Sequence, residues 1–438
     1  MGLVAASAIV AGIILGTAIF VQPSEISRLV PSIPAMTAVW LLAGLLTLCG
    51  AMTCAELASA FPHTGGVYVF LKEGISPAAG FLWGWAMFWT MHSGIIAAIA
   101  VIVARYAGFF FPLDSRGVKA VAIGVILLLS GVNYLGVRQG SALQTVLTAA
   151  KVLAIALIFV SVFAVAAPAS AAPMPSLQAA PPGFREFVLA LSAGLFAFGG
   201  WHMVTYTAGE TRDPSRTIPR ALLVGTLVVT ACYLSLNAVY VRVLPLPQLI
   251  ASERVAADAA RVLVGPGGAA IVSVLVILSG AGSLNGIILG GPRVYFAMAQ
   301  DRLAFRWLGA IHPRFHTPHA AILAQALWSS ALVASGSYRT LFTRVVYTEW
   351  LFFALMTAGL FRLRRRASYA PAFRVWGYPL VPVLFVLACV AIFTNQIAAD
   401  PRESAIGLLF VIAGLPVYYV WARFAPSSRK GDPGRARD

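Results

Sequence analysis

The stretch GIILGTAIF at residues 12–20 places two glycines, Gly12 and Gly16, inside an apolar segment near the N-terminus. A second stretch, FAFGGW at residues 196–201, does the same near the middle of the chain. A helix that breaks at glycine frees main-chain N–H and C=O groups, which are tolerated at bilayer depth only where they line a cavity. Two interrupted helices in corresponding positions of two halves predict the binding site of a secondary transporter. The alternative is that these glycines only allow helices to pack closely.

The composition of the chain is that of a polytopic membrane protein. Of its 438 residues, 60% are hydrophobic and 11% are charged, whereas soluble domains carry about 25% charged residues. A bilayer is crossed by about 20 predominantly apolar residues, and twelve windows approach or exceed that length. We therefore predict an all-α membrane protein with twelve transmembrane helices. The windows cover residues 2–24, 29–55, 74–104, 120–137, 141–168, 187–209, 221–241, 262–292, 317–338, 345–361, 375–399 and 404–422.

The net charge of +16 is better explained by membrane topology than by nucleic-acid binding. Basic residues gather at residues 362–366, RLRRR, and in the tail at residues 423–437. Lys and Arg mark cytoplasmic segments of membrane proteins and contact anionic lipid headgroups. We therefore predict a multi-pass protein of the cytoplasmic (inner) membrane with both termini in the cytoplasm.

An Ala- and Pro-rich segment at residues 164–183 predicts an external loop between two halves. Residues 1–168 would form a first repeat of five spans and residues 169–366 a second. Because five is odd, the second repeat would be inverted relative to the first. Residues 367–424 would add the last two spans, and residues 425–438 are predicted to form a disordered basic tail.

The first break offers groups that match an amino acid. Helix N-termini favour anions, so the N–H groups of Thr17 and Ala18 suit a carboxylate. Unwound carbonyls such as that of Ile14 suit an ammonium group. The second break, at residues 196–200, offers the same kinds of group from the opposite direction. Together the breaks predict a site for a zwitterionic α-amino acid.

Lys151 lies about ten residues into the fifth window, or roughly 15 Å deep at 1.5 Å per residue. An ammonium group at this depth is costly and predicts a functional role. We expect it to fill a cation position between spans, in place of bound sodium, or to carry a proton. The alternative is a lysine near the interface that extends its long side chain to water.

Two glutamates are further candidates. Glu349 lies beside Trp350 in the tenth window, where it could pair with a cation, contact the substrate or relay a proton. The alternative interpretation is that Glu349 forms an interfacial ion pair with Arg344. Glu56 follows the second window and is predicted either to anchor a cytoplasmic gate by pairing with a basic loop residue or to end a helix in water.

Aromatic and polar residues near the breaks complete the predicted site. Phe196 is expected to cover the substrate as a gate, together with Trp350, unless it is an ordinary core aromatic. His202 is expected to be a polar wall residue, since a lone histidine implies no metal. No metal-ligand spacing, nucleophile with its base or phosphate-binding loop points to an enzyme or to a cofactor.

The four cysteines all lie in apolar windows and are expected to be small core residues. Because no predicted external loop holds a cysteine, no covalently attached partner subunit is expected.

Five motifs in order resemble those of the APC superfamily of amino-acid transporters, and within it the L-type amino-acid transporter family, here of a bacterial type. The resemblance covers nearly the whole chain. The motifs are GTAIF at residues 16–20, AELASAFPHTGGVY at 55–68, TAAK at 148–151, FAFGGW at 196–201 and AGSLNG at 281–286.

This resemblance implies a LeuT-type fold with a five-plus-five inverted repeat and discontinuous first and sixth spans. It also implies sodium-independent transport, often by exchange, with Lys151 in the vacated sodium position near Ser283. The carboxylate would bind at Thr17 and Ala18. The substrate-binding residues predicted from the breaks and the resemblance are Ile14, Gly16, Thr17, Ala18, Phe196, Ala197, Gly199, His202 and Glu349.

The most direct prediction is therefore an antiporter of neutral L-amino acids that works by alternating access. The alternative is proton-coupled symport of amino acids, including cationic amino acids or polyamines, with Glu349 and Lys151 as proton carriers.

Overall fold

A computed structural model describes residues 1–164, 183–252, 254–337 and 344–424. The regular elements of these residues are all helices. The described residues thus confirm the all-helical class that the sequence predicts. Most of the predicted loop between the halves, and the predicted tail at residues 425–438, lie outside the described residues.

Nine helical segments in the described ranges are long and apolar enough to cross a membrane. Four of them combine two or more elements separated by at most three residues. The segments are α3 (Ile33–Ala60), α5 (Pro77–Ala86) with η2 (Met87–Met91) and α6 (His92–Ala107), α7 (Ser115–Tyr134), α8 (Val137–Ala164), α9 (Phe184–Ala197) with η3 (Trp201–Glu210), α10 (Pro214–Val243), α13 (Gly268–Gly290) with α14 (Pro292–Gln300), α18 (Leu380–Ala399), and α19 (Pro401–Ile412) with α20 (Gly414–Phe424).

The first, ninth and tenth predicted windows hold shorter helices. These are α1 (Leu3–Ile14) with η1 (Ala18–Phe20) and α2 (Gln22–Leu29), α15 (His319–Ser335) and α17 (Thr348–Leu363). Every predicted window therefore contains helix, while the count of twelve spans and the inverted repeat stay predictions. Short connecting elements are α4 (Val67–Gly74), α11 (Leu246–Ala251), α12 (Val255–Val264), η4 (Gly265–Gly267) and η5 (Arg306–Gly309).

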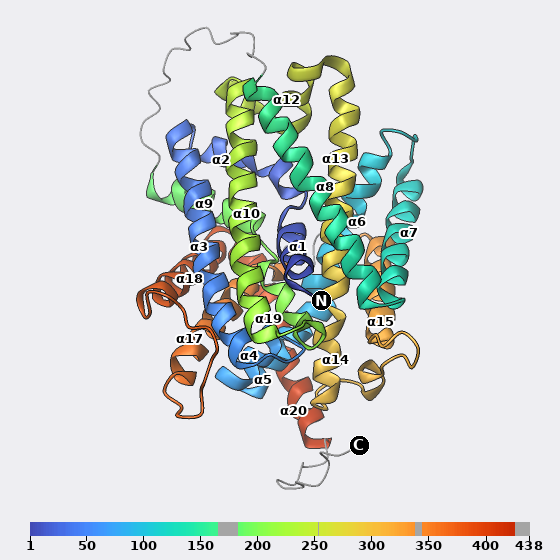
Figure 1. Cartoon of the computed structure of the whole chain (residues 1–438), viewed down its shortest axis with the longest axis vertical. Coiled ribbons are helices and arrows are strands. Elements are labelled where there is room, and N and C mark those ends of the chain that lie inside the picture. Colours follow the sequence, from blue (N-terminus) through green and yellow to red (C-terminus); the bar gives the residue numbers. More distant parts are fainter. Residues whose placement is uncertain (165–182, 253, 338–343, 425–438) are drawn as a thin grey trace.

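The short α1 lies in the middle of the bundle, and α8, α10 and α13 pack around it (Figure 1). Small residues make this close approach possible. A Cβ atom at Gly225 of α10 would collide with Val10 of α1, and one at Gly44 of α3 would collide with Thr230 of α10. Membrane helices commonly use glycine in this way, because the hydrophobic effect does not drive their association.

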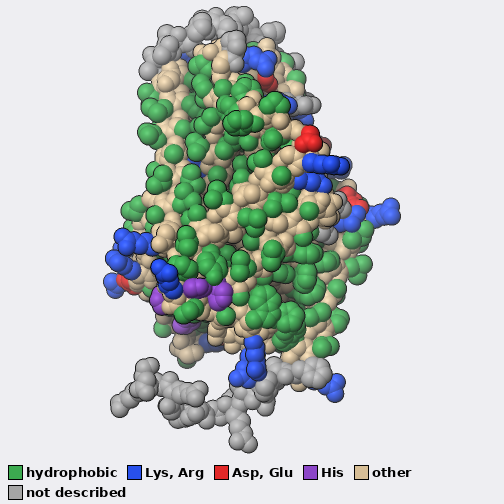
Figure 2. Space-filling view, turned by 90° about the vertical axis from the view of Figure 1, so that its right-hand side faces the viewer, with side chains coloured by type: hydrophobic (Ala, Val, Ile, Leu, Met, Phe, Trp, Pro, Cys, Tyr) green, Lys and Arg blue, Asp and Glu red, His purple; other side chains and the backbone are tan. Residues whose placement is uncertain are grey.

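The outer surface is largely apolar. Figure 2 shows one face covered mainly by hydrophobic side chains, with Lys and Arg gathered in separate patches. Exposed leucines occur on helices that pack at the outside of the bundle, among them Leu128 of α7, Leu157 of α8 and Leu387 of α18. Such side chains suit contact with lipid tails.

The buried side of α18 packs into the bundle through Phe385. Phe385 is buried, and its ring occupies the space that a Cβ atom at Gly50 of α3 would need. The same ring lies 6.0 Å, between centroids, from that of Trp201. Helix α18 is thereby in contact with the first residue of η3.

Candidate functional site

The first predicted break is present. Helix α1 ends at Ile14, and the chain resumes at Ala18 as the single turn η1 before α2 begins at Gln22. Leu15 has a non-helical backbone, with φ −66° and ψ 62°. Within the described residues, the N–H groups of Thr17 and Ala18 have no hydrogen-bond acceptor. They are therefore available to a ligand, as the sequence predicts.

The second predicted break is also present, between α9 and η3. Helix α9 ends at Ala197, and Gly200 adopts a left-handed conformation with φ +94° before η3 begins at Trp201. The side chain of Ile13 fills the space that a Cβ atom at Gly200 would need. The two breaks therefore touch each other, and glycine is required at this contact for both backbone and packing reasons.

Lys151 of α8 holds the end of α1. Its ammonium group donates hydrogen bonds of 2.8 Å to the carbonyls of both Gly12 and Leu15, and its Nζ lies 3.5 Å from Oγ of Ser283. The side chain is only 5% exposed. The amino group thus lies buried between helices, and the alternative of a lysine extended to the interface is wrong.

Two serines of α13 bind the same end of α1. Ser283 donates to the carbonyls of Gly12 and Ile13 at 3.0 and 2.9 Å, and Ser279 donates to that of Leu15 at 2.7 Å. The carbonyls freed by the first break are therefore bonded to donors from α8 and α13. A helix break at bilayer depth requires such hydrogen bonds to its freed carbonyls.

Tyr233 of α10 joins the two breaks, and the sequence analysis did not identify it. Its hydroxyl oxygen lies 2.6 Å from the carbonyl oxygen of Ile14 and 2.8 Å from that of Ala197. The Ile14 carbonyl also accepts from the N–H of Gly16. The only signal in the sequence is a tyrosine in an apolar window, since a buried tyrosine hydroxyl usually finds a partner.

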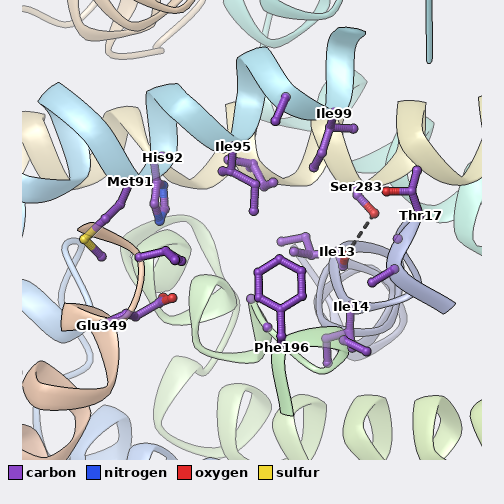
Figure 3. Close-up of a pocket in the computed structure, with 18 of the residues that line it drawn as sticks. Ile13, Ile14, Thr17, Met91, His92, Ile95, Ile99, Phe196, Ser283 and Glu349 are labelled. Carbon is purple, nitrogen blue, oxygen red and sulfur yellow. Dashed lines mark hydrogen bonds between the residues drawn. The ribbon is translucent and has the colours of Figure 1, made fainter. Parts of the chain in front are cut away.

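A cavity of about 370 Å³ lies against both breaks (Figure 3). Its walls include all the predicted substrate-binding residues except His202, and also Ser283 and Trp350. The predicted residues that line it are Ile14, Gly16, Thr17, Ala18, Phe196, Ala197, Gly199 and Glu349. Lys151 lies behind the wall rather than in it, which fits a structural cation rather than a direct substrate ligand.

Phe196 projects into the middle of the cavity (Figure 3). It is 43% exposed, whereas the nearby Phe198 is buried against Trp40 and Tyr233. The interpretation of Phe196 as an ordinary core aromatic is therefore wrong. Its position over the cavity is the one that a gate needs, although its movement stays a prediction.

Glu349, in the first turn of α17, lines the cavity, and its Oε1 lies 3.6 Å from Nε2 of the fully buried His202. The alternative ion pair with Arg344 is wrong, because Arg344 pairs with Glu403 instead. His202 itself lies behind the wall, where its ring packs against those of Trp83 and Phe353.

Glu56 is fully buried at the end of α3. It accepts hydrogen bonds of 2.8 and 2.5 Å from the guanidinium of Arg364 and one of 2.7 Å from the N–H of Val375. The bonds to Glu56 raise the pKa of Arg364, while burial and then the Glu56 charge raise the pKa of Tyr369. The expected pairing with a basic residue is confirmed, and the alternative of a solvated helix end is wrong.

Further charged contacts join other helices. Arg293 of α14 pairs with Glu210 of η3, and Lys72 and Tyr68 of α4 both donate to Asp301. The cysteines at positions 49, 54, 232 and 389 are buried, as predicted for small core residues.

Comparison with known proteins agrees with this geometry. The chain matches the amino acid permease family over residues 1–431. The serine/threonine exchanger SteT of Bacillus subtilis (strain 168) is 31% identical over 96% of both chains. The human b(0,+)-type amino acid transporter 1 is 29% identical, over 97% of this chain and 88% of its own length. The human large neutral amino acids transporter small subunit 2 is 30% identical, over 96% and 80% respectively.

These relatives confirm the predicted kinship with amino-acid transporters of the APC superfamily. Family and relatives are membrane transporters rather than enzymes. Because the family match spans residues 1–431, this chain belongs to the amino acid permease family.

Proposed function

We propose that the chain is a sodium-independent exchanger of L-amino acids, with neutral amino acids as its first substrates. The observation that carries this proposal is the ammonium group of Lys151, bonded to the carbonyls of Gly12 and Leu15 beside Ser283. Carbonyls of unwound helices are the groups that coordinate sodium in transporters of this architecture. A fixed ammonium in that position satisfies the same oxygens and removes the need for the ion.

The substrate carboxylate would bind the free N–H groups of Thr17 and Ala18. The ammonium group of the same substrate would bind two carbonyls at the second break, those of Phe196 and Gly199. The Ile14 carbonyl already accepts from Tyr233 and Gly16, so it can join only when one of these donors withdraws. Phe196 would cover the bound substrate, with Trp350 beside it.

The cycle would alternate access to this cavity by moving one group of helices against another. In the proposed topology, twelve spans form two inverted repeats of five plus a final pair, with both termini in the cytoplasm of a bacterial cell. The ion pair of Glu56 with Arg364 would hold the cytoplasmic side closed. No covalent partner subunit is proposed.

Purified protein in liposomes tests this proposal. Uptake of labelled alanine should require unlabelled amino acid inside the vesicles and should not change when external sodium is replaced by choline. Uptake into vesicles without internal amino acid would contradict exchange, and uptake that needs sodium would contradict sodium independence.

A second candidate, proton-coupled symport, is supported by the proximity of Glu349 to His202 at the cavity wall. A carboxyl group and an imidazole can hold one proton between them and release it as access alternates. In that case an inward proton gradient would drive uptake into empty vesicles, and cationic amino acids or polyamines would be among the substrates.

A further inference from the structure

One end of the cavity is lined by polar groups that make no hydrogen bond to a described residue. Glu349 and His92 both face the cavity there, and His202 backs Glu349 (Figure 3). All four ring nitrogens of His92 and His202 lack a hydrogen-bond partner in the described structure. The Glu349 carboxylate likewise accepts no hydrogen bond from a described side chain. We refer to Glu349, His92 and His202 as the acidic end.

The protein does not satisfy these groups by itself. In the described ranges no Lys or Arg lies within ion-pair distance of Glu349, and Arg344 is committed to Glu403. His92 and His202 are 2% and 0% exposed, and aromatic rings fix the imidazole of His202 in place. Because unpaired buried polar groups are costly and rare, the missing donors are expected from a ligand.

The opposite end of the cavity is formed by the first break. Figure 3 shows Thr17 and Ser283 on that side, with Phe196 and Ile95 between them and Glu349. An amino acid with its carboxylate at Thr17 would therefore extend its side chain along Phe196 toward Glu349. A cavity of about 370 Å³ has room for a long side chain.

We propose that the acidic end is the subsite for the substrate side chain and selects amino acids whose side chains carry an N–H or O–H donor. Amide, hydroxyl and ammonium side chains share this chemistry. The inference rests on the proposed function, whose substrate class it narrows. A site built to hydrogen-bond its substrate discriminates strongly against an analogue without the donor, because its own polar groups are then left unpaired.

Competition for alanine exchange tests the subsite, since the alanine side chain is too short to use it. The competitors form pairs of similar shape: glutamine and methionine, lysine and norleucine, and tyrosine and phenylalanine. In the wild type, the donor-bearing member of at least one pair should compete about tenfold better or more. In Glu349→Leu that preference should fall to within about threefold.

Two further variants make the test specific. Glu349→Gln keeps a hydrogen-bond acceptor but removes the charge, so a preference for glutamine should survive while a preference for lysine should be lost. Glu186→Leu removes an exposed carboxylate of α9 outside the cavity and should leave every ratio unchanged. A glutamine preference that survives in Glu349→Gln, or a lysine preference that is lost in it, supports the subsite. The outcome also shows whether the substrate side chain donates from an amide or from an ammonium group.

Failure of the subsite can be told apart from failure of exchange. Alanine exchange with equal competition in all three pairs would overturn the subsite and leave the proposed function intact. A preference that persists unchanged in Glu349→Leu would also overturn it. If no exchange occurs, thermal stabilisation of the wild-type protein by each competitor gives the same ratios without transport.

Discussion

The two breaks that meet at the cavity are held in different ways. Lys151, Ser279 and Ser283, from two helices, bind the carbonyls at the end of α1, and one of these donors is charged. At the end of α9, the carbonyl of Ala197 accepts a hydrogen bond from the neutral hydroxyl of Tyr233, beside a left-handed glycine and the half-exposed Phe196. We therefore expect the first break to keep its shape during transport and the second break to be the one that moves.

The largest effect is expected from removing the charge at the first break. Lys151→Ala should lower transport about 100-fold or more, because the carbonyls of Gly12 and Leu15 lose the donor that joins them to α8 and keep only serine hydroxyls of α13. Uptake normalised to the amount of reconstituted protein measures this. Thr148→Val, one turn earlier on α8, removes only a neutral bond to Ala8 and should cost a few-fold at most. Normal uptake by Lys151→Ala would refute the role of the cation.

At the second break, a change in the backbone conformation of Gly200 should have the next largest effect. Gly200→Ala would force a left-handed conformation that costs about 1–2 kcal/mol, and its Cβ would meet Ile13. We expect about tenfold slower transport and a lower melting temperature. Gly124→Ala in α7, where a Cβ would meet nothing within 4 Å, is the matched control and should leave both unchanged. Equal behaviour of the two variants would show that the second break is not constrained.

The link between the breaks should have a moderate effect. Tyr233→Phe removes the hydroxyl shared by Ile14 and Ala197, at about 1 kcal/mol, so exchange should slow roughly fivefold. Tyr240→Phe, two turns along α10, removes a buried hydroxyl that has no described partner and should be neutral or stabilising. Loss of exchange in Tyr240→Phe but not in Tyr233→Phe would contradict the shared bond.

The smallest effect is expected at the aromatic gate. Phe196→Ala should lower the maximal exchange rate about threefold while changing KM by less, because a gate affects turnover more than binding. Phe198→Ala, two residues on, should instead destabilise the protein by about 3–5 kcal/mol, since this ring is buried. Equal maximal rates of the wild type and Phe196→Ala would count against gating.

The sequence predicts the two breaks and the buried lysine well, because each is marked by a residue that is unusual in a continuous apolar helix. Glycines such as Gly16 and Gly200 interrupt helices, and Lys151 is a charge in an apolar window. Those signals are local, and the helix ends at Ile14 and Ala197 lie within a few residues of the predicted positions.

The partners of these residues could not be predicted, because they depend on packing between distant segments. Glu56 pairs with Arg364, 308 positions away, and Arg344 turns to Glu403 rather than to its sequence neighbour Glu349. Tyr233 is one tyrosine among thirteen, and nothing in its window indicates that it reaches two freed carbonyls.

Phe385 connects the last helices of the chain to the region of the second break. These helices follow both predicted repeats in the chain, yet this ring joins α18 to Trp201 at the start of η3. Since the opposite side of α18 carries exposed Leu384 and Leu387, a change in bilayer thickness that tilts this helix would be transmitted to the cavity. The lipid composition of the membrane would then set the speed of exchange without any lipid entering the binding site.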